Sequence, residues 1–271
     1  MIERLGGWFR STVARLAKIG IGPREFGVIV AAVVVATGAF AYALSTRGAG
    51  PAGGGEFDRA ERAAIREVVR QYILDNPEII PEAVNRLQQR EVTKLLDSNR
   101  DEIERPFAGA WAGAKDGDVV LVEFFDYNCP YCRLSHPDVQ RLIKEDDDLK
   151  VVFRDFPVLG PASEEAAMAS LSAAGQNRFL AYYKRSFEAP GRPNRERTIR
   201  MIRAAGLNEG QTASDLNSNA LKAELRKNLE LGRALGLTGT PTYIVGNRIL
   251  SGAVGYDALK QAIDEARRRE R

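Results

Sequence analysis

The chain has 271 residues, 44% of them hydrophobic and 28% charged, with a formal net charge of +3. This length and composition suffice for a medium-sized globular domain with appended segments, and such a core needs neither a metal nor a set of disulfides. The near balance of 39 basic and 36 acidic residues argues against nucleic-acid binding, which requires a concentrated basic face.

The amino-terminal part of the chain has the pattern of an export segment. Residues 1–25 are polar and basic, and residues 26–46 carry no charged side chain. A helix of that length can cross a bilayer, so the sequence predicts a cytoplasmic tail followed by a transmembrane anchor. The alternative is a cleaved signal peptide, because Ala39-Phe40-Ala41 fits a small-x-small cleavage site. We therefore expect either a bacterial inner-membrane protein that faces the periplasm or a protein secreted into the periplasm after cleavage.

Two amphipathic helices are predicted between a linker and the main domain. Residues 47–60 include the run GAGPAGGG and predict a flexible linker. In residues 61–105, apolar side chains recur at helical spacing in two runs, and Asp75-Asn76-Pro77 breaks the helix between them. The apolar positions are Ile65, Val68, Val69, Tyr72 and Ile73, and then Ile80, Ala83, Val84, Leu87, Val92, Leu95 and Leu96. These faces either pack on the downstream domain or pair with copies of the chain, and we favour self-association through residues 61–97.

The main domain is predicted to begin near Pro106 and to open with a βαβ unit. Residues 119–125 (VVLVEFF) form a nearly continuous apolar run, which is typical of a strand buried on both faces. A helical pattern follows over residues 129–144, and a second strand is predicted over residues 151–156. A strand, a helix and a strand in this order predict a parallel pair joined by a right-handed crossover.

The second half of the main domain is separated from the first by a helical insert. Residues 160–236 are mostly helical in pattern. Two short strands, 242–245 and 248–251, follow, and Gly246-Asn247 between them is a hairpin signal. A helix from residue 256 closes the chain. The sequence therefore predicts an α/β domain over residues 106–271 with an insert at about 160–236.

The two cysteines of the chain, Cys129 and Cys132, are separated by only two residues. A disulfide that closes so short a loop stabilises a fold by only about 2 kcal/mol on the chain-entropy model, so the pair is better suited to exchange. It follows a strand and begins a helix, whose positive end and free N–H groups stabilise a thiolate. Cys129 is therefore the predicted attacking sulfur and Cys132 the resolving sulfur. Pro130 suits the first helical turn, where no N–H partner is needed.

Metal binding is the main alternative use of these cysteines. His136 completes the spacing CxxCxxxH, but the chain has no third cysteine and no second histidine, and a structural zinc site takes four ligands. We therefore expect no metal site and no cofactor besides a redox-active Cys129–Cys132 disulfide, with His136 a surface or packed residue. Copper(I) binding by the soft thiolates remains a non-catalytic alternative.

Two further features converge on the cysteine pair. Glu123 is an acid within the apolar strand, and a buried carboxyl group has a raised pKa and can relay a proton. It could serve Cys132 during resolution; the alternative is a carboxylate that faces solvent from a strand edge. Thr240-Pro241 precedes a strand, and an X-Pro bond there can be cis or trans. A cis-proline loop beside the cysteines leaves a free backbone edge at Thr240, to which a substrate chain can add as a strand.

Three separated blocks of sequence together resemble the DsbA-type thioredoxin-fold family. They are VVLVEFFDYNCPYC, FRDFPVLG and GLTGTPTYIVGNRILSG, and they occur in the family's order with a helical insert between them. The resemblance covers about residues 106–271 and implies a thioredoxin-like fold. It also implies that Cys129 is the nucleophile, that Cys132 is its partner, that Pro241 is cis beside the disulfide and that Glu123 is the family's acid.

The upstream stretch REVVRQYILDNPEIIPEAVNRLQQRE resembles the amino-terminal helices of ScsC-like members of this family. Some relatives of that branch are trimers through this region and shuffle disulfides. The resemblance therefore implies a homo-oligomer, of the trimer type, formed through residues 61–97.

These observations predict a membrane-anchored disulfide oxidoreductase, of oxidase or isomerase type, that acts on the thiols and disulfides of exported proteins and is served by a membrane redox partner. Thr240, Pro241, Pro130 and Tyr131 are the expected substrate-binding residues. The dipeptide Pro130-Tyr131 differs from the Pro-His of strongly oxidising DsbA proteins, and Thr240 matches isomerase-type relatives, so a pure oxidase is not favoured. A dedicated reductase for one partner and a membrane-tethered assembly scaffold are the remaining alternatives.

Overall fold

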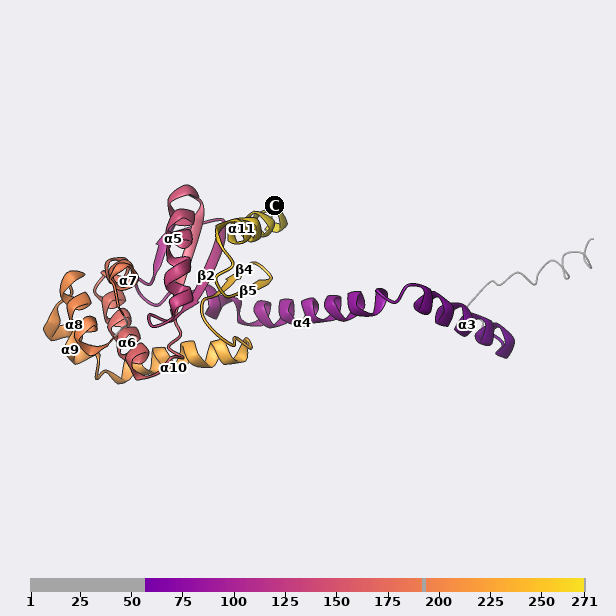
Figure 1. Ribbon diagram of the computed structural model, residues 1–271, viewed down its shortest axis with the longest axis horizontal. Coiled ribbons are helices and arrows are strands. Elements are labelled where there is room, and N and C mark those ends of the chain that lie inside the picture. Colours follow the sequence, from indigo (N-terminus) through magenta and orange to yellow (C-terminus); the bar gives the residue numbers. More distant parts are fainter. Residues whose placement is uncertain (1–56, 192–193, 271) are drawn as a thin grey trace, which may run out of the picture. The chain divides into compact units, whose positions relative to one another are not determined.

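The computed structural model describes residues 57–191 and 194–270 (Figure 1). The predicted cytoplasmic tail, the predicted membrane segment and nearly all of the predicted linker lie outside these ranges. Within them, no helix is both long and apolar enough to span a bilayer. The chain divides into two units at Pro77.

In the first unit, helix α3 (Arg59–Asp75) begins at a capping box. The Asp58 carboxylate accepts hydrogen bonds from the backbone N–H groups of Ala60 and Glu61, and the Glu61 carboxylate accepts one from Asp58 N–H. The helix ends at Asn76, which donates to the Tyr72 carbonyl and precedes Pro77. No residue of α3 is buried, and most of its apolar side chains are exposed, Val68 to 69%.

In the second unit, the described strands form one five-stranded sheet in the order β1-β3-β2-β4-β5. Strands β2 and β3 are parallel, and the other neighbouring pairs are antiparallel. The strands are β1 (Trp111–Gly113), β2 (Val119–Phe125), β3 (Leu149–Asp155), β4 (Thr242–Val245) and β5 (Arg248–Ser251). The predicted parallel pair and the predicted hairpin are confirmed. Strand β1 was not predicted, because three residues are too few to show a two-residue alternation.

Helices cover both faces of the sheet, as Figure 1 shows. Alternate side chains of a strand point to opposite faces, so Leu121 and Phe125 enter one core and Val122 and Phe124 enter the other. The first core is closed by α5 (Pro130–Glu145), α11 (Tyr256–Glu270) and much of the insert, and the second by α4 (Ile79–Glu104) and α10 (Asn219–Ala234). The insert consists of α6 (Pro161–Gly175), α7 (Phe179–Glu188), α8 (Arg195–Ala204), α9 (Glu209–Asp215) and α10 (Asn219–Ala234). This arrangement confirms the predicted thioredoxin-like fold with a helical insertion.

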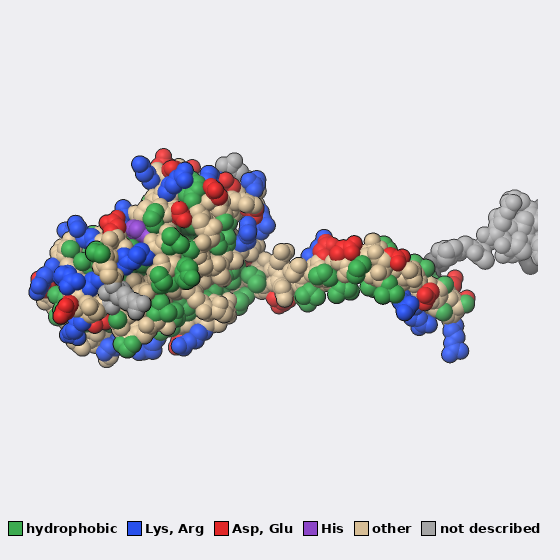
Figure 2. Space-filling view, viewed as in Figure 1, with side chains coloured by type: hydrophobic (Ala, Val, Ile, Leu, Met, Phe, Trp, Pro, Cys, Tyr) green, Lys and Arg blue, Asp and Glu red, His purple; other side chains and the backbone are tan. Residues whose placement is uncertain are grey.

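Helix α4 has two halves with different surroundings. Its carboxyl-terminal half packs on the sheet, where Leu96 and Ile103 are buried in the same cluster as Phe124. Its amino-terminal half leaves Ile80, Val84 and Leu87 between 48% and 58% exposed, and Figure 2 shows apolar side chains along this stretch. Within α4, the first predicted role of these helices, packing on the downstream domain, therefore applies to the carboxyl-terminal half.

A buried arginine holds the end of α4 against the sheet. Arg154, from β3, is 2% exposed and donates to the carbonyls of Glu102 and Arg105 at the end of α4. It also donates to the side chain of Asn228 at 2.8 Å, and its guanidinium lies 3.6 Å from the Glu224 carboxylate, both on α10. A cation satisfies the free carbonyls at a helix carboxyl terminus. Arg154 therefore joins α4, β3 and α10 at one point.

We expect Arg154→Ala to lower the free energy of unfolding by about 3–5 kcal/mol, because it leaves several buried carbonyls and one carboxylate without their donor. Urea unfolding measures the change. Arg86→Ala, on the exposed half of α4, removes an arginine whose ion pair is largely solvated and should cost less than about 0.5 kcal/mol. Equal effects of the two substitutions would contradict the role given to Arg154.

Candidate functional site

The cysteine pair lies where β2 ends and α5 begins. Cys129 is the residue that precedes the helix, Pro130 is its first residue, and Cys132 lies one turn further on. The turn between strand and helix is held by Asp126, whose carbonyl accepts a hydrogen bond from Cys129 N–H at 3.0 Å. The carboxylate of Asp126 accepts from the N–H groups of Asn128, Val158 and Leu159.

Asp126 was not predicted as a site residue. It ties the loop of the cysteines to the loop that follows β3, because its two carboxylate oxygens bind backbone N–H groups from both. An acid at the end of a buried strand, directly before a turn, is the signal in the sequence that could have identified it.

The sulfur of Cys129 is held in a form that favours the thiolate. The pKa of Cys129 is lowered to about 5, chiefly by a hydrogen bond from the Cys132 thiol, although burial opposes the shift. The side chain of Thr240 and the backbone N–H groups of Tyr131 and Cys132 add to the lowering of this pKa. A thiol with such a pKa is almost entirely thiolate at neutral pH, and the thiolate is the nucleophile in disulfide exchange.

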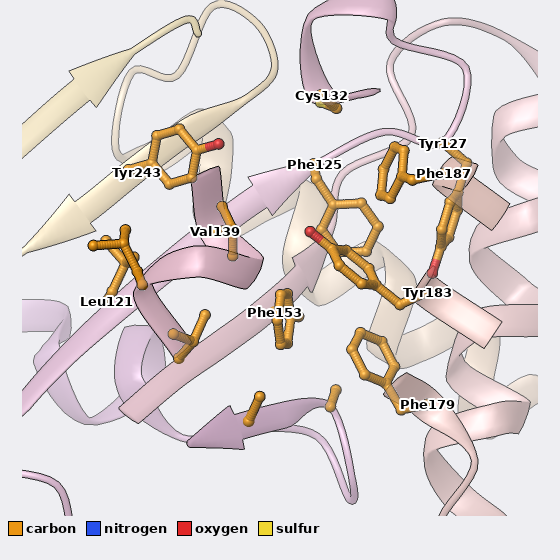
Figure 3. Close-up of a cluster of buried hydrophobic side chains, with 14 of the residues drawn as sticks. Leu121, Phe125, Tyr127, Cys132, Val139, Phe153, Phe179, Tyr183, Phe187 and Tyr243 are labelled. Carbon is orange, nitrogen blue, oxygen red and sulfur yellow. The ribbon is translucent and has the colours of Figure 1, made fainter. Parts of the chain in front are cut away.

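Cys132 has the opposite character. It is fully buried, and burial strongly raises its pKa, with the negative charges of Cys129 and Glu123 adding to the effect. Figure 3 shows Cys132 beside the cluster of aromatic side chains that includes Phe125 and Tyr127. Both cysteines are buried, but they differ in charge state, because the pKa of Cys129 is lowered and that of Cys132 is raised.

The loop before β4 lies directly beside Cys129. The Thr240–Pro241 peptide bond is cis, which is the isomer that the family resemblance implies. The sulfur of Cys129 lies 3.1 Å from the Thr240 carbonyl oxygen. The structure thus brings Cys129, Thr240 and Pro241 together, although more than one hundred residues separate them in the sequence.

The alternative interpretation of Glu123, a carboxylate that faces solvent from a strand edge, is wrong. Glu123 lies in β2, which has a neighbouring strand on both sides, and it is 0% exposed. Burial raises the pKa of Glu123 to about 7, against hydrogen bonds from Tyr183 and Tyr243 that lower it. The Tyr183 hydroxyl donates at 2.7 Å and the Tyr243 hydroxyl at 3.4 Å. A carboxyl group with this pKa exchanges protons near neutral pH.

The surface around Cys129 is apolar on two sides and hollow on a third. Tyr131 and Leu134 on α5 are 61% and 66% exposed, and Val158 and Leu159 after β3 are 45% and 47% exposed. Pro130 is also exposed. A cavity of about 320 Å³ adjoins the sulfur, lined by Tyr127, Asn128, Cys129, Pro130, Arg133, Leu159 and Gly191. The exposed surface near Cys129 therefore includes apolar side chains from α5 and from the segment after β3.

His136 is a packed residue of the helix core. It is 5% exposed, and its ring lies against Tyr183 and Phe187 at centroid distances of 5.2 and 5.4 Å. Burial lowers its pKa. It therefore serves as part of the contact between α5 and α7.

A redox-active cysteine pair at the start of a helix, opposite a cis-proline loop on a thioredoxin-like sheet, defines a thiol–disulfide oxidoreductase. The profile of the DSBA-like thioredoxin domain family matches residues 120–264, which is more than half of the chain. The chain therefore belongs to this family. Residues 61–92 match a second profile, described as the copper resistance protein ScsC N-terminal domain, and this confirms the resemblance to ScsC-like members.

Solved structures of similar proteins agree with this family assignment. A linker-deletion mutant of Proteus mirabilis ScsC, which also carries a point substitution, is 32% identical in sequence, with a TM-score of 0.62, and the match covers 80% of this chain and all of that one. A thioredoxin-like oxidoreductase from Silicibacter pomeroyi DSS-3 is 36% identical, with a TM-score of 0.60, over 63% of this chain and 98% of that one.

The chain spans little more than a quarter of the curated relatives that it matches first. One of these is the Na(+)/H(+) antiporter NhaA 1 of Mycobacterium sp. (strain KMS), which is 29% identical over 181 residues. The match covers 65% of this chain and 28% of that protein.

The Cys132 thiol should control the titration of Cys129. We expect Cys132→Ala to raise the pKa of Cys129 by about one unit from about 5, because the largest stabilising hydrogen bond is lost. Cys132→Ser, which keeps a hydroxyl donor, should retain most of the lowering. The pH dependence of thiolate absorbance and of alkylation by iodoacetamide measures both. A Cys132→Ala variant that titrates like the wild type would show that Cys132 has no such effect.

Proposed function

We propose that this protein oxidises or isomerises disulfides in exported proteins through the Cys129–Cys132 pair, with its catalytic domain in the periplasm. The observation that carries the proposal is the contrast between an ionised Cys129 and a protonated, buried Cys132. The apolar run of residues 26–46 supports membrane attachment, or export by a signal peptide, and in either case delivers the domain outside the reducing cytoplasm.

The state of Cys129 supports oxidation or isomerisation rather than reduction. A disulfide is a strong oxidant when its reduced form is stabilised, and a thiolate held by several hydrogen bonds stabilises the reduced form. The lowered pKa of Cys129, about 5, is such a stabilisation. A dedicated reductase for one partner needs the reverse, a reduced pair that gives up its electrons readily.

We propose that a client chain binds in extended form beside the cis-proline. Its cysteine sulfur would lie against Cys129, and its backbone would pair with the free edge at Thr240. The exposed Pro130 and Tyr131 would contact the residues that flank the client cysteine. Main-chain pairing does not depend on side-chain identity, so this mode of binding suits an enzyme with many clients.

Glu123 is proposed as the proton donor and acceptor for Cys132. When a client thiolate attacks Cys129, the Cys129–Cys132 bond breaks and its electron pair stays on the Cys132 sulfur. That sulfur is buried and has a strongly raised pKa, so it must take up a proton. Glu123 is buried in the same region with a pKa of about 7, and it can supply the proton at neutral pH and accept it in the reverse step.

The reduction potential of the pair tests the direction of electron flow. We expect the Cys129–Cys132 disulfide to equilibrate with glutathione at a potential more positive than about −200 mV. Cys132→Ser, which cannot resolve, should accumulate mixed disulfides with several exported proteins in cells, whereas Cys129→Ser should accumulate few. A potential near that of thioredoxin, about −270 mV, with a single trapped client would instead indicate a dedicated reductase.

Self-association through residues 61–97 is proposed as the assembly of this protein, in the form of a trimer. The exposed apolar side chains of α3 and of the amino-terminal half of α4 support self-association, because apolar patches on a protein surface mark sites of contact with other proteins. The match of residues 61–92 to the ScsC N-terminal domain adds support. A multimer would present several cysteine pairs to one client, which suits isomerisation.

Charges placed on the exposed half of α4 should break this assembly. We expect the double substitution Val84→Lys and Leu87→Lys to reduce the mass of the full chain in mild detergent to that of a monomer, as measured by multi-angle light scattering. Gln89→Lys adds one such charge to the opposite side of α4 and should leave the mass unchanged. A monomeric wild-type protein, or an unchanged mass in the double variant, would refute assembly through this surface.

A further inference from the structure

Two tyrosines from distant parts of the chain converge on Glu123. Tyr183 comes from α7 in the helical insert, and Tyr243 comes from β4, two residues after the cis-proline. Both side chains are fully buried, at 0% exposure. Figure 3 shows their hydroxyl groups pointing toward the space between them, on the side of the core below Cys132. Their hydroxyls donate to the two oxygens of one carboxyl group, Tyr183 to Oε2 and Tyr243 to Oε1.

We infer that Tyr183 and Tyr243 are positioning residues that hold the Glu123 carboxyl group in place and determine how readily it gives its proton to Cys132. The inference rests on the proposed role of Glu123 and goes beyond it, because it assigns control of that role to two further side chains. A phenol hydroxyl that donates to a carboxylate stabilises the ionised form. Each hydrogen bond therefore makes Glu123 a stronger acid than burial alone allows.

The surroundings of Glu123 make these two hydrogen bonds decisive. The titratable groups that act on or respond to it are Tyr183 on α7, Tyr243 on β4, Cys132 on α5 and Tyr127 in the turn after β2. The thiol and the phenols are uncharged when protonated, so the phenol donors, rather than an ion pair, offset the cost of ionising the buried carboxyl group. Loss of one donor should therefore change its acidity directly.

The proton moves from Glu123 to Cys132 in the half-reaction that oxidises the client. The client thiolate forms a bond to the Cys129 sulfur, the Cys129–Cys132 bond breaks, and the Cys132 sulfur takes its proton from Glu123, which becomes a carboxylate held by Tyr183 and Tyr243. A second client thiolate then attacks the client sulfur of the mixed disulfide and releases Cys129 as a thiolate. The client loses two electrons and the cysteine pair gains them.

The test uses the oxidised full-length protein and a dithiol peptide in single turnover. The rate, corrected for the fraction of peptide thiolate, should fall as pH rises through the pKa of Glu123, near 7 in the wild type. In Tyr183→Phe this falling limb should move to higher pH by about one unit, because the carboxylate has lost its shorter hydrogen bond. In Tyr243→Phe, which loses the 3.4 Å contact, it should move in the same direction by less.

A neighbouring tyrosine supplies the matched control. Tyr182 is as deeply buried on the same helix, but its hydroxyl donates to the Ala166 carbonyl at 3.2 Å. Tyr182→Phe should therefore leave the falling limb at the wild-type pH. The titration of Cys129, followed by thiolate absorbance in the reduced proteins, should be the same in all three variants. A general loss of packing would not shift the falling limb in Tyr183→Phe and Tyr243→Phe while leaving it in place in Tyr182→Phe.

Glu123→Gln distinguishes the role of Glu123 as proton donor from the role of Tyr183 and Tyr243. If the falling limb persists in Glu123→Gln, Glu123 is not the proton donor and the proposed function loses that step. If Glu123→Gln abolishes the limb but Tyr183→Phe and Tyr243→Phe leave it in place, the role of the tyrosines is overturned and that of Glu123 stands. If Tyr183→Phe does not fold, the direction of the shift in Tyr243→Phe decides. In Glu123→Gln, adding Tyr183→Phe should have no further effect on the pH profile.

Discussion

One turn of helix separates the two sulfurs of this protein, and the difference in their electrostatic surroundings across that turn is the constraint on which the rest of the site depends. The helix start presents free N–H groups and a partial positive charge to Cys129. Cys132, three residues later, faces the aromatic core, where ionisation is costly. Because the same helix supplies both environments, the thiol of Cys132 can donate to Cys129 and lower its pKa.

The remainder of the fold maintains this difference. The turn before the helix is held by the Asp126 carboxylate, which binds N–H groups from two loops. The cis-proline loop positions a carbonyl 3.1 Å from the Cys129 sulfur. The helical insert closes the core over Cys132 with Tyr183 and Phe187. A sheet and helix without the insert would leave Cys132 and Glu123 nearer to water, and their pKa values would return toward those of ordinary groups.

The amino-terminal helices show how one periodic pattern can have two outcomes. Apolar side chains recur along α4 from Ile80 to Ile103, and the pattern predicts an amphipathic helix throughout. Only the carboxyl-terminal half meets the sheet, where Arg154 binds the last carbonyls of the helix. The amino-terminal half has the same kind of apolar face without a partner among the described residues. A pattern of hydrophobicity specifies which face is to be covered, but the covering partner depends on where the helix meets the rest of the fold.

The sequence by itself determined the fold class, the cysteine chemistry and the order of the elements, because these follow from local signals: an apolar run, a CxxC at a helix start, and a Gly-Asn hairpin. It also identified Glu123 and the Thr240-Pro241 step as candidates, without their surroundings. Only the tertiary structure decided that Glu123 is buried, that Asp126 joins two loops and that Tyr183 and Tyr243 reach the same carboxyl group. Tyr183 lies sixty residues from Glu123 and Tyr243 lies twice as far, so no local pattern could reveal contacts that arise only when the insert and the strands pack together.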